Sequence, residues 1–179
     1  MRLFIAIDLP AEIKQALGQL RCDLPGARWV AAAQIHLTLA FLGEVEEARV
    51  APLVTELARI HLPPFTLDLT GPGCFPHRQR PRVLWVGLTP QPLLTQLAAA
   101  VQEALFVCGF PLEERPFSPH LTLARLKFPA PREVGVFLDQ PLPASFPVFA
   151  VREFILFESR LNPHGAEHLP LRSFPLAVV

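Results

Sequence analysis

The sequence has 179 residues, of which 51% are hydrophobic, and its 16 basic residues balance 16 acidic ones, so the formal net charge is zero. This length suits one globular domain, and the zero net charge excludes the strong positive field of a protein that coats nucleic acid. No hydrophobic run reaches the roughly 20 residues of a membrane-spanning helix, and the N-terminal stretch lacks a signal-peptide cleavage site, so we expect a cytoplasmic protein.

Hydrophobic periodicity predicts strands and helices in alternation. Short apolar or alternating runs indicate strands, apolar residues at i, i+3, i+4 and i+7 indicate helices, and glycine and proline clusters mark loops. In chain order the predicted elements are a strand at 2–8, a helix at 9–20, the strand IHLTLAFLG at 35–43, a helix at 44–60, a strand at 65–71, a loop at 71–81, a strand at 82–88, a helix at 89–109, the strand PHLTLARL at 119–126, a short helix at 131–139 and a strand at 146–159.

The order of strand, helix and motif strand occurs twice. The letters HLTLA appear at 36–40 and again at 120–124, and each copy follows its strand and helix at a similar distance. Two copies do not make a solenoid, which needs three or more repeats. We therefore predict a single domain, 1–179, made of two related lobes at roughly residues 1–75 and 80–160.

The repeated letters place a histidine and a threonine on one face of each motif strand. Side chains two residues apart share a face, so His36 and Thr38 point one way, and His120 with Thr122 repeats this parity. Imidazole titrates near neutral pH, so one ring can hold a proton for a leaving group while its twin accepts one from water. Threonine hydroxyls can donate hydrogen bonds to phosphate oxygens. Two such strands facing each other suit a tetrahedral, oxygen-rich anion, and this scheme requires no metal.

A single H-x-T on an apolar strand is more often an ordinary core or cross-strand pair. Two copies change this balance, because a duplication gives no packing reason to keep both polar residues on the same face. Buried polar groups also cost free energy unless they are paired. The pair therefore favours a catalytic function.

The two motifs resemble the paired H-x-T/S-x signatures of the two-histidine (2H) phosphoesterase superfamily, in particular its RNA 2′,3′-cyclic phosphodiesterase branch, historically called 2′-5′ RNA ligases. The likeness extends over almost the whole chain through RLFIAIDLP, GPGCFP, PRVLWVGL and FILFESRLNPHG. It implies a bilobal α+β fold with pseudo-two-fold symmetry, in which two antiparallel sheets line a central cleft and helices cover the outer faces.

The resemblance also implies an activity, namely hydrolysis of 2′,3′-cyclic phosphate RNA ends to 2′-phosphates, with reverse 2′-5′ ligation as a further reaction. Carried over to this sequence, His36 is the proton donor to the departing 3′ oxygen, His120 is the proton acceptor from water, and Thr38 and Thr122 bind the phosphate. We expect RNA 3′ ends or cyclic nucleotides as substrates, no metal or cofactor, no membrane partner and a monomer. Two alternatives stay open: a phosphodiesterase for ADP-ribose cyclic phosphate or 2′-5′ oligoadenylate, and a noncatalytic RNA-end-binding module.

Four further residues are candidates for substrate contact. Phe41 and Arg125 lie five residues after the two histidines, and this odd offset puts them on the opposite face of a regular strand. A substrate contact therefore needs a β-bulge or a strand end; otherwise Phe41 is a core residue and Arg125 supports the site from behind. Arg78 and Arg80, in HRQRPR (77–82), could hold an RNA backbone through its phosphates or lie in a solvated charged loop.

The remaining histidines and the cysteines give no site. His164 and His168 are four apart, as helical metal ligands would be, but their Pro-Gly context excludes a helix, so we expect surface residues. Cys22, Cys74 and Cys108 are odd in number and lack C-x-x-C spacing, which argues against disulfides and against a cysteine zinc site. We expect three buried, reduced thiols.

Overall fold

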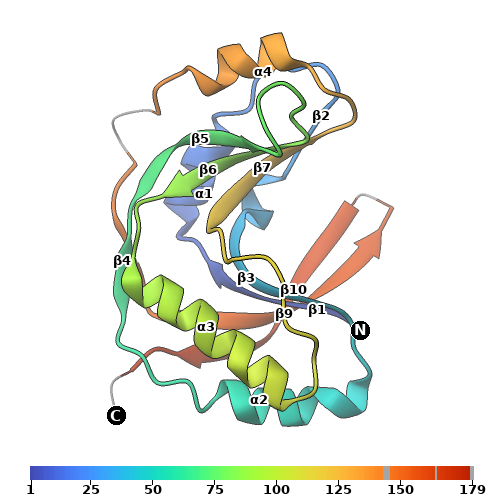
Figure 1. Ribbon diagram of the computed structural model, residues 1–179, viewed down its shortest axis with the longest axis vertical. Helices are drawn as coiled ribbons and strands as arrows, with labels where there is room; N and C mark the ends of the chain where they lie inside the picture. The colour runs from blue at the N-terminus through green and yellow to red at the C-terminus, as the bar shows by residue number, and fades with distance from the viewer. Residues whose placement is uncertain (143–145, 164, 178–179) are drawn as a thin grey trace.

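Antiparallel strands flanked by helices form the protein (Figure 1), and the computed structural model describes residues 1–142, 146–163 and 165–177. The helices are α1 (Ala11–Gly18), α2 (Val50–Leu57), α3 (Pro92–Val107) and α4 (Pro131–Leu138), with 3-10 turns η1 (Ala32–Gln34) and η2 (Glu47–Arg49). The strands are β1 (Arg2–Asp8), β2 (Ala27–Trp29), β3 (His36–Glu44), β4 (Phe65–Leu67), β5 (Leu69–Phe75), β6 (Val83–Leu88), β7 (His120–Leu126), β8 (Phe149–Val151), β9 (Glu153–Asn162) and β10 (Gly165–Pro175).

The sheet consists of two halves that meet at one point. Within the described ranges, eight strands follow the order β10–β9–β1–β3–β7–β6–β5 with β2 beside β7, and β4 pairs separately with β8. The pairing between neighbouring strands is antiparallel. β3 and β7 are joined through the pair Leu37 and Leu121. The predicted α+β class with antiparallel sheets is therefore confirmed, and the two predicted sheets are the halves on either side of this pair (Figure 1).

The main hydrophobic core lies on the face to which Leu37 and Leu121 point. Both leucines are fully buried there, and burial of a side chain of this size contributes about 1.5–3 kcal/mol. A second, smaller cluster lies on the opposite face of β1 and β9, formed by residues that alternate along these strands with residues of the main core. The main cluster also contains Ile13 and Leu17 of α1, Leu53 and Leu57 of α2, and Leu97 and Val101 of α3, whereas the second consists of Phe4, Ala6, Ile155 and Phe157.

The predicted helices are all present, and their ends follow local chemistry. α3 begins at Pro92, because the Gln91 side chain accepts a hydrogen bond from the Leu93 amide at 3.3 Å and a proline in the first turn needs no donor. It ends before Gly109, whose φ of 73° lies in the left-handed region that favours glycine. Among the helices of the described segments, none combines the length and apolar character needed to cross a membrane.

The strands differ from the prediction in several places, one of which is the predicted strand at 146–159: Arg152 separates β8 from β9, and β8 pairs with β4 outside the main sheet. The predicted loop at 71–81 is wrong at its start, because β5 continues to Phe75. Gly73 within β5 lies against the Trp85 ring, and a Cβ there would overlap it, so this glycine marks a close approach rather than a turn. The predicted strand 65–71 divides at Asp68 between β4 and β5. β2 and β10 were not predicted: β2 has only three residues and directly follows Pro25 and Gly26, and Pro170 interrupts the hydrophobic pattern of β10.

The cysteines also depart from the prediction. All three thiols are free, as expected, but Cys22 is exposed and Cys74 and Cys108 are half-buried. The expectation that they are buried is therefore wrong. Cys22 lies just after α1 and Cys108 just after α3, where the chain turns at the surface.

Candidate active site

The two HLTLA motifs begin adjacent strands. His36 is the first residue of β3 and His120 is the first residue of β7. Leu37 lies directly opposite Leu121, and both point into the main core. Because side chains alternate along a strand and directly paired residues point to the same side, the two imidazoles point to the opposite face. We call this the histidine face of the sheet.

Thr38 and Thr122 lie on the histidine face with the imidazoles and are half-buried, as the histidines are. In a regular antiparallel ladder this register sets His36 level with Thr122 and His120 level with Thr38, and such diagonal histidines are about 7–8 Å apart. β3 and β7 share one residue pair, so the strands diverge on either side of it. An anion held between them would meet one imidazole and one hydroxyl from each strand.

The same backbone contact holds both imidazoles. The Nδ1 atom of His36 lies 2.7 Å from the Gln34 carbonyl oxygen, and the Nδ1 atom of His120 lies 2.7 Å from the Ser118 carbonyl oxygen. A carbonyl oxygen only accepts, so each Nδ1 carries a hydrogen and donates it. This leaves Nε2 of each ring as the atom that can accept or release a proton.

Each motif strand also carries a β-bulge at the same place. The pairing with the neighbouring strand skips Leu39 in β3 and Leu123 in β7. One extra residue reverses the parity of the residues after it, so Phe41 and Arg125 turn to the histidine face. Phe41 is 73% exposed and its ring lies 6.2 Å from that of Phe4, and Arg125 is exposed. The reading of Phe41 as a core residue is wrong, and the bulge that a substrate contact requires is present in both strands.

Aromatic rings and a charged pair surround His36. The ring centroids of Phe4 and His168 lie 4.9 Å and 5.1 Å from that of His36. Asp8, opposite His36 on β1, forms an ion pair with Lys14 at 2.6 Å. Burial lowers the pKa of His36 from 6.5 to about 4; His168 and Lys14 add to this lowering, and the backbone hydrogen bond and Asp8 oppose it. The His36 ring is therefore neutral in the free protein at pH 7.

Different groups surround His120. The Phe75 ring lies 4.9 Å from it at an interplanar angle of 90°, and the Trp85 ring lies 6.4 Å away. Gly87 occupies the position opposite His120 that Asp8 occupies opposite His36. The Trp85 indole nitrogen is buried and has no hydrogen-bond partner within the described residues. The two histidines thus share their backbone contact but not their surroundings.

His168 is a further residue of this face, and the prediction for it is wrong. It was expected at the surface, but it is half-buried and its ring packs against that of His36. The Gln34 side-chain amide donates to the carbonyl of Ala166, two residues before it. No spacing in the sequence signals this contact, because β9 and β1 lie between β10 and β3 in the sheet. His164, the other histidine of this segment, lies outside the described residues.

A family model described as LigT like Phosphoesterase matches the chain at residues 7–85 and 86–166, so each match contains one of the two motifs. The chain belongs to the LigT-like phosphoesterase family. The family predicted from the two motifs is thereby confirmed.

Curated relatives match nearly the whole of this LigT-like chain. A relative from Archaeoglobus fulgidus is 36% identical over 177 residues, which cover 97% of this chain and 99% of the relative, and one from Escherichia coli K12 is 38% identical over 98% and 96%. A relative from Geobacillus stearothermophilus is 36% identical over 97% of this chain but 56% of its own length, so this chain spans about half of it. All three are named RNA 2′,3′-cyclic phosphodiesterase.

Solved structures agree with this LigT-like assignment. The crystal structure of E. coli LigT complexed with 3′-AMP superimposes with a TM-score of 0.85 at 36% identity, over 98% of this chain and 97% of that one. A second crystal structure, of a protein described as a phosphoesterase, gives a TM-score of 0.85 at 37% identity, over 98% of each chain. These likenesses cover both halves of the sheet.

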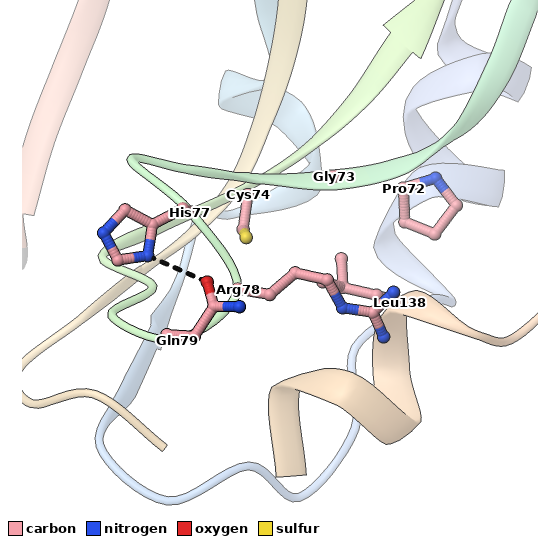
Figure 2. A pocket seen from close by; sticks show the side chains of 7 residues that line it. All are labelled: Pro72, Gly73, Cys74, His77, Arg78, Gln79 and Leu138. Atoms are coloured by element: carbon pink, nitrogen blue, oxygen red, sulfur yellow. Dashed lines mark hydrogen bonds between the residues drawn. The ribbon is translucent and has the colours of Figure 1, made fainter. Parts of the chain in front are cut away.

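Arg78 and Arg80 lie in the loop between β5 and β6. Arg78 donates to the Asp139 carboxylate at 2.8 Å, so its side chain extends toward α4 (Figure 2), and Arg80 is exposed. Phe75 of β5 contacts His120 and so lies on the histidine face. Its neighbour Cys74 points to the opposite face of β5, where it lines a cavity beside this loop. That cavity has a volume of about 410 Å³ and is lined by Pro72, Gly73, Cys74, His77, Arg78, Gln79 and Leu138.

Proposed function

We propose that this chain hydrolyses 2′,3′-cyclic phosphate ends of RNA to 2′-phosphates. Its relatives carry the name of this activity at 36–38% identity. The observation that carries the proposal is the register at Leu37 and Leu121, which turns both H-x-T pairs to one face. An acid and a base on either side of one phosphorus are what in-line opening of a cyclic phosphate requires.

In the proposed mechanism, Nε2 of His120 accepts a proton from water as the water oxygen attacks phosphorus. The bond between phosphorus and O3′ breaks, and Nε2–H of His36 gives its proton to the departing O3′. The hydroxyls of Thr38 and Thr122 donate to the non-bridging oxygens as negative charge develops there. The product is a 2′-phosphate, and the protonation states of the two rings are exchanged.

The lowered pKa of His36 adds a condition to this assignment. The free ring is neutral at pH 7, so the proton on Nε2 has to be taken up with the substrate. The substrate favours this uptake, because a cyclic phosphodiester carries one negative charge and an adjacent anion raises the pKa of an imidazole. Binding of a 2′,3′-cyclic mononucleotide to the inactive His120→Ala variant should therefore take up a proton near pH 6.5, measured by calorimetry in two buffers of different ionisation enthalpy, and this uptake should vanish when His36→Gln is added.

The same acid and base can act in reverse, so 2′-5′ ligation is part of the proposal, and no metal or cofactor takes part.

The site is complete within one chain, which supports a monomer. Free thiols, one of them exposed, support the reducing cytoplasm as its location. Equal bulges and equal Nδ1 contacts support an origin of the lobes, roughly 1–75 and 80–160, in one duplicated unit.

The test is hydrolysis of 2′,3′-cyclic mononucleotides by wild type, His36→Ala and His120→Ala, with the product isomer identified. We expect a 2′-phosphate product, undiminished turnover in EDTA, and a loss of about 10²- to 10⁴-fold in each variant with unchanged thermal unfolding. Full turnover in the double variant contradicts the mechanism. Binding without turnover in wild type indicates a noncatalytic RNA-end-binding module, and faster turnover of ADP-ribose cyclic phosphate or 2′-5′ oligoadenylate indicates that other substrate.

A further inference from the structure

His168 takes part in a group of three rings around His36. Its ring lies 5.1 Å from that of His36 at an interplanar angle of 80° and 4.9 Å from that of Phe4 at 70°. Phe4 and His36 are themselves 4.9 Å apart, so the three rings contact one another. Edge-to-face contacts of this kind favour a fixed relative orientation of the rings. The His36 ring is thus held by two neighbouring rings in addition to its Nδ1 hydrogen bond.

The hairpin of β9 and β10 curves to bring His168 to this position. Two strands lie between β10 and β3, and strands are spaced about 4.8 Å apart, so a flat sheet would separate the two backbones by roughly 14 Å. A ring distance of 5.1 Å therefore requires the hairpin to bend over the histidine face. Gln34 secures the bend, because its side chain donates to the Ala166 carbonyl while its own carbonyl accepts from His36 Nδ1.

We propose that His168 is a positioning residue for His36, whose ring it packs against edge to face, fixing the direction of Nε2 and shielding the ring from water. This inference rests on the proposed function, in which His36 transfers a proton. His120 is contacted by Phe75 and Trp85 instead, so the device belongs to one half of the site.

The groups around His36 and His168 indicate how removal of His168 should change the pKa of His36. Asp8 faces His36 from β1, Lys14 from α1 and His168 from β10, and Lys14 also faces His168. Burial is the largest cause of the lowered pKa of both histidines, ahead of any neighbouring charge. Loss of the His168 ring should therefore change the pKa of His36 more than loss of the His168 charge alone.

The test follows the titration of the His36 ring by NMR in the protein without substrate, with the signal assigned by its loss in His36→Gln. The wild-type midpoint is expected at about 4. In His168→Ala, water reaches the ring and the midpoint should rise toward the ~6.5 of a free imidazole. His168→Phe keeps a packed ring without a titratable group, and its midpoint should stay near that of wild type.

Two enzymatic measurements accompany the titration. His168→Ala should lower kcat about tenfold or more with little change in KM, because a misdirected Nε2 impairs proton transfer rather than binding. Gln34→Ala releases the hairpin without altering either imidazole and should act in the same direction to a smaller extent. Glu167→Ala, an exposed neighbour whose side chain points to the other side of β10, is the matched control and should match wild type.

Two results overturn the inference: an unchanged His36 titration in His168→Ala, or equal shifts in His168→Ala and His168→Phe. The titration needs no turnover, so it stands apart from the proposed function. A wild-type protein that does not hydrolyse cyclic phosphates refutes the proposed function, whereas the NMR result alone decides whether His168 shields the His36 ring.

Discussion

The β3 and β7 motifs have the same local structure and different neighbours. Both carry the same five letters, a bulge at the same position and an Nδ1 hydrogen bond of 2.7 Å to the residue two before the histidine. His36 then packs among Phe4 and His168, whereas His120 packs against Phe75. The repeated letters therefore set the direction of each imidazole, while the strands beside them decide which rings and charged groups surround it.

Among the variants that compare the two halves, those of the two threonines should have the largest effect on kcat. Thr38→Val and Thr122→Val keep the shape and β-propensity of the side chain and remove one donor to the phosphate. Each should lower kcat by about 10²-fold if the halves contribute equally to binding developing charge. Thr66→Val, at an exposed position of β4, is the control. A loss in only one of the two threonine variants would show that the phosphate is held by one half.

Substitutions of Arg125 and Phe41 are expected to affect different kinetic constants, kcat for Arg125 and KM for Phe41. Arg125→Ala should lower kcat about tenfold, because a guanidinium on the histidine face can stabilise charge on the phosphate. Phe41→Ala should instead raise KM severalfold for substrates with a base, because base stacking on an aromatic ring contributes about 1–3 kcal/mol. Phe106→Ala, which removes a ring 62% exposed on α3, and Arg132→Ala on α4 are the controls. Equal kinetics in all four variants would contradict a contact by either residue.

His36, in the β3 half, should make the stability of the chain depend on pH. The pKa of His36 is about 4 in the folded chain, against about 6.5 for an unfolded histidine, so the unfolded state binds more protons between these values. The free energy of unfolding should therefore fall as pH falls from about 6.5 to about 4, by at most about 3 kcal/mol from this residue. Urea unfolding at both pH values measures it. His36→Gln should flatten the dependence, and a fall as steep as that of wild type would contradict the buried, neutral ring.

The smallest effect is expected outside the histidine face. The double change Arg78→Ala with Arg80→Ala should weaken binding of RNA several nucleotides long a fewfold at moderate salt, and should spare mononucleotides, because backbone phosphate contacts need a longer chain. Asp139→Asn is the control, since it removes the partner of Arg78 and keeps the cation. Equal KM values for long and short substrates would exclude the loop as an RNA contact.

Helices and strands with a regular hydrophobic period could be predicted, whereas features that depend on pairing with a distant segment could not. The helices followed from apolar spacing, and the motif strands from their alternation. The second half of β5 was missed because the glycines and prolines from Gly71 to Pro76 suggested a loop, whereas the small size of Gly73 admits the ring of Trp85 from the next strand. The face of Phe41 was uncertain for a similar reason, because the bulge that decides it lies in the pairing with β1. His168 was misplaced because its position follows from the curvature of a hairpin.

The order of residues was enough to predict the family, the helices, the motif strands and the parity that puts each histidine beside its threonine, because these depend on near neighbours in the chain and on the periods of helix and strand. Three features needed the folded chain: Leu37 faces Leu121, both bulges turn the fifth residue after the histidine to the same face, and His168 covers His36 but not His120. Such pairings join residues far apart in the chain, and they are selected by the packing of the whole core rather than by any local pattern.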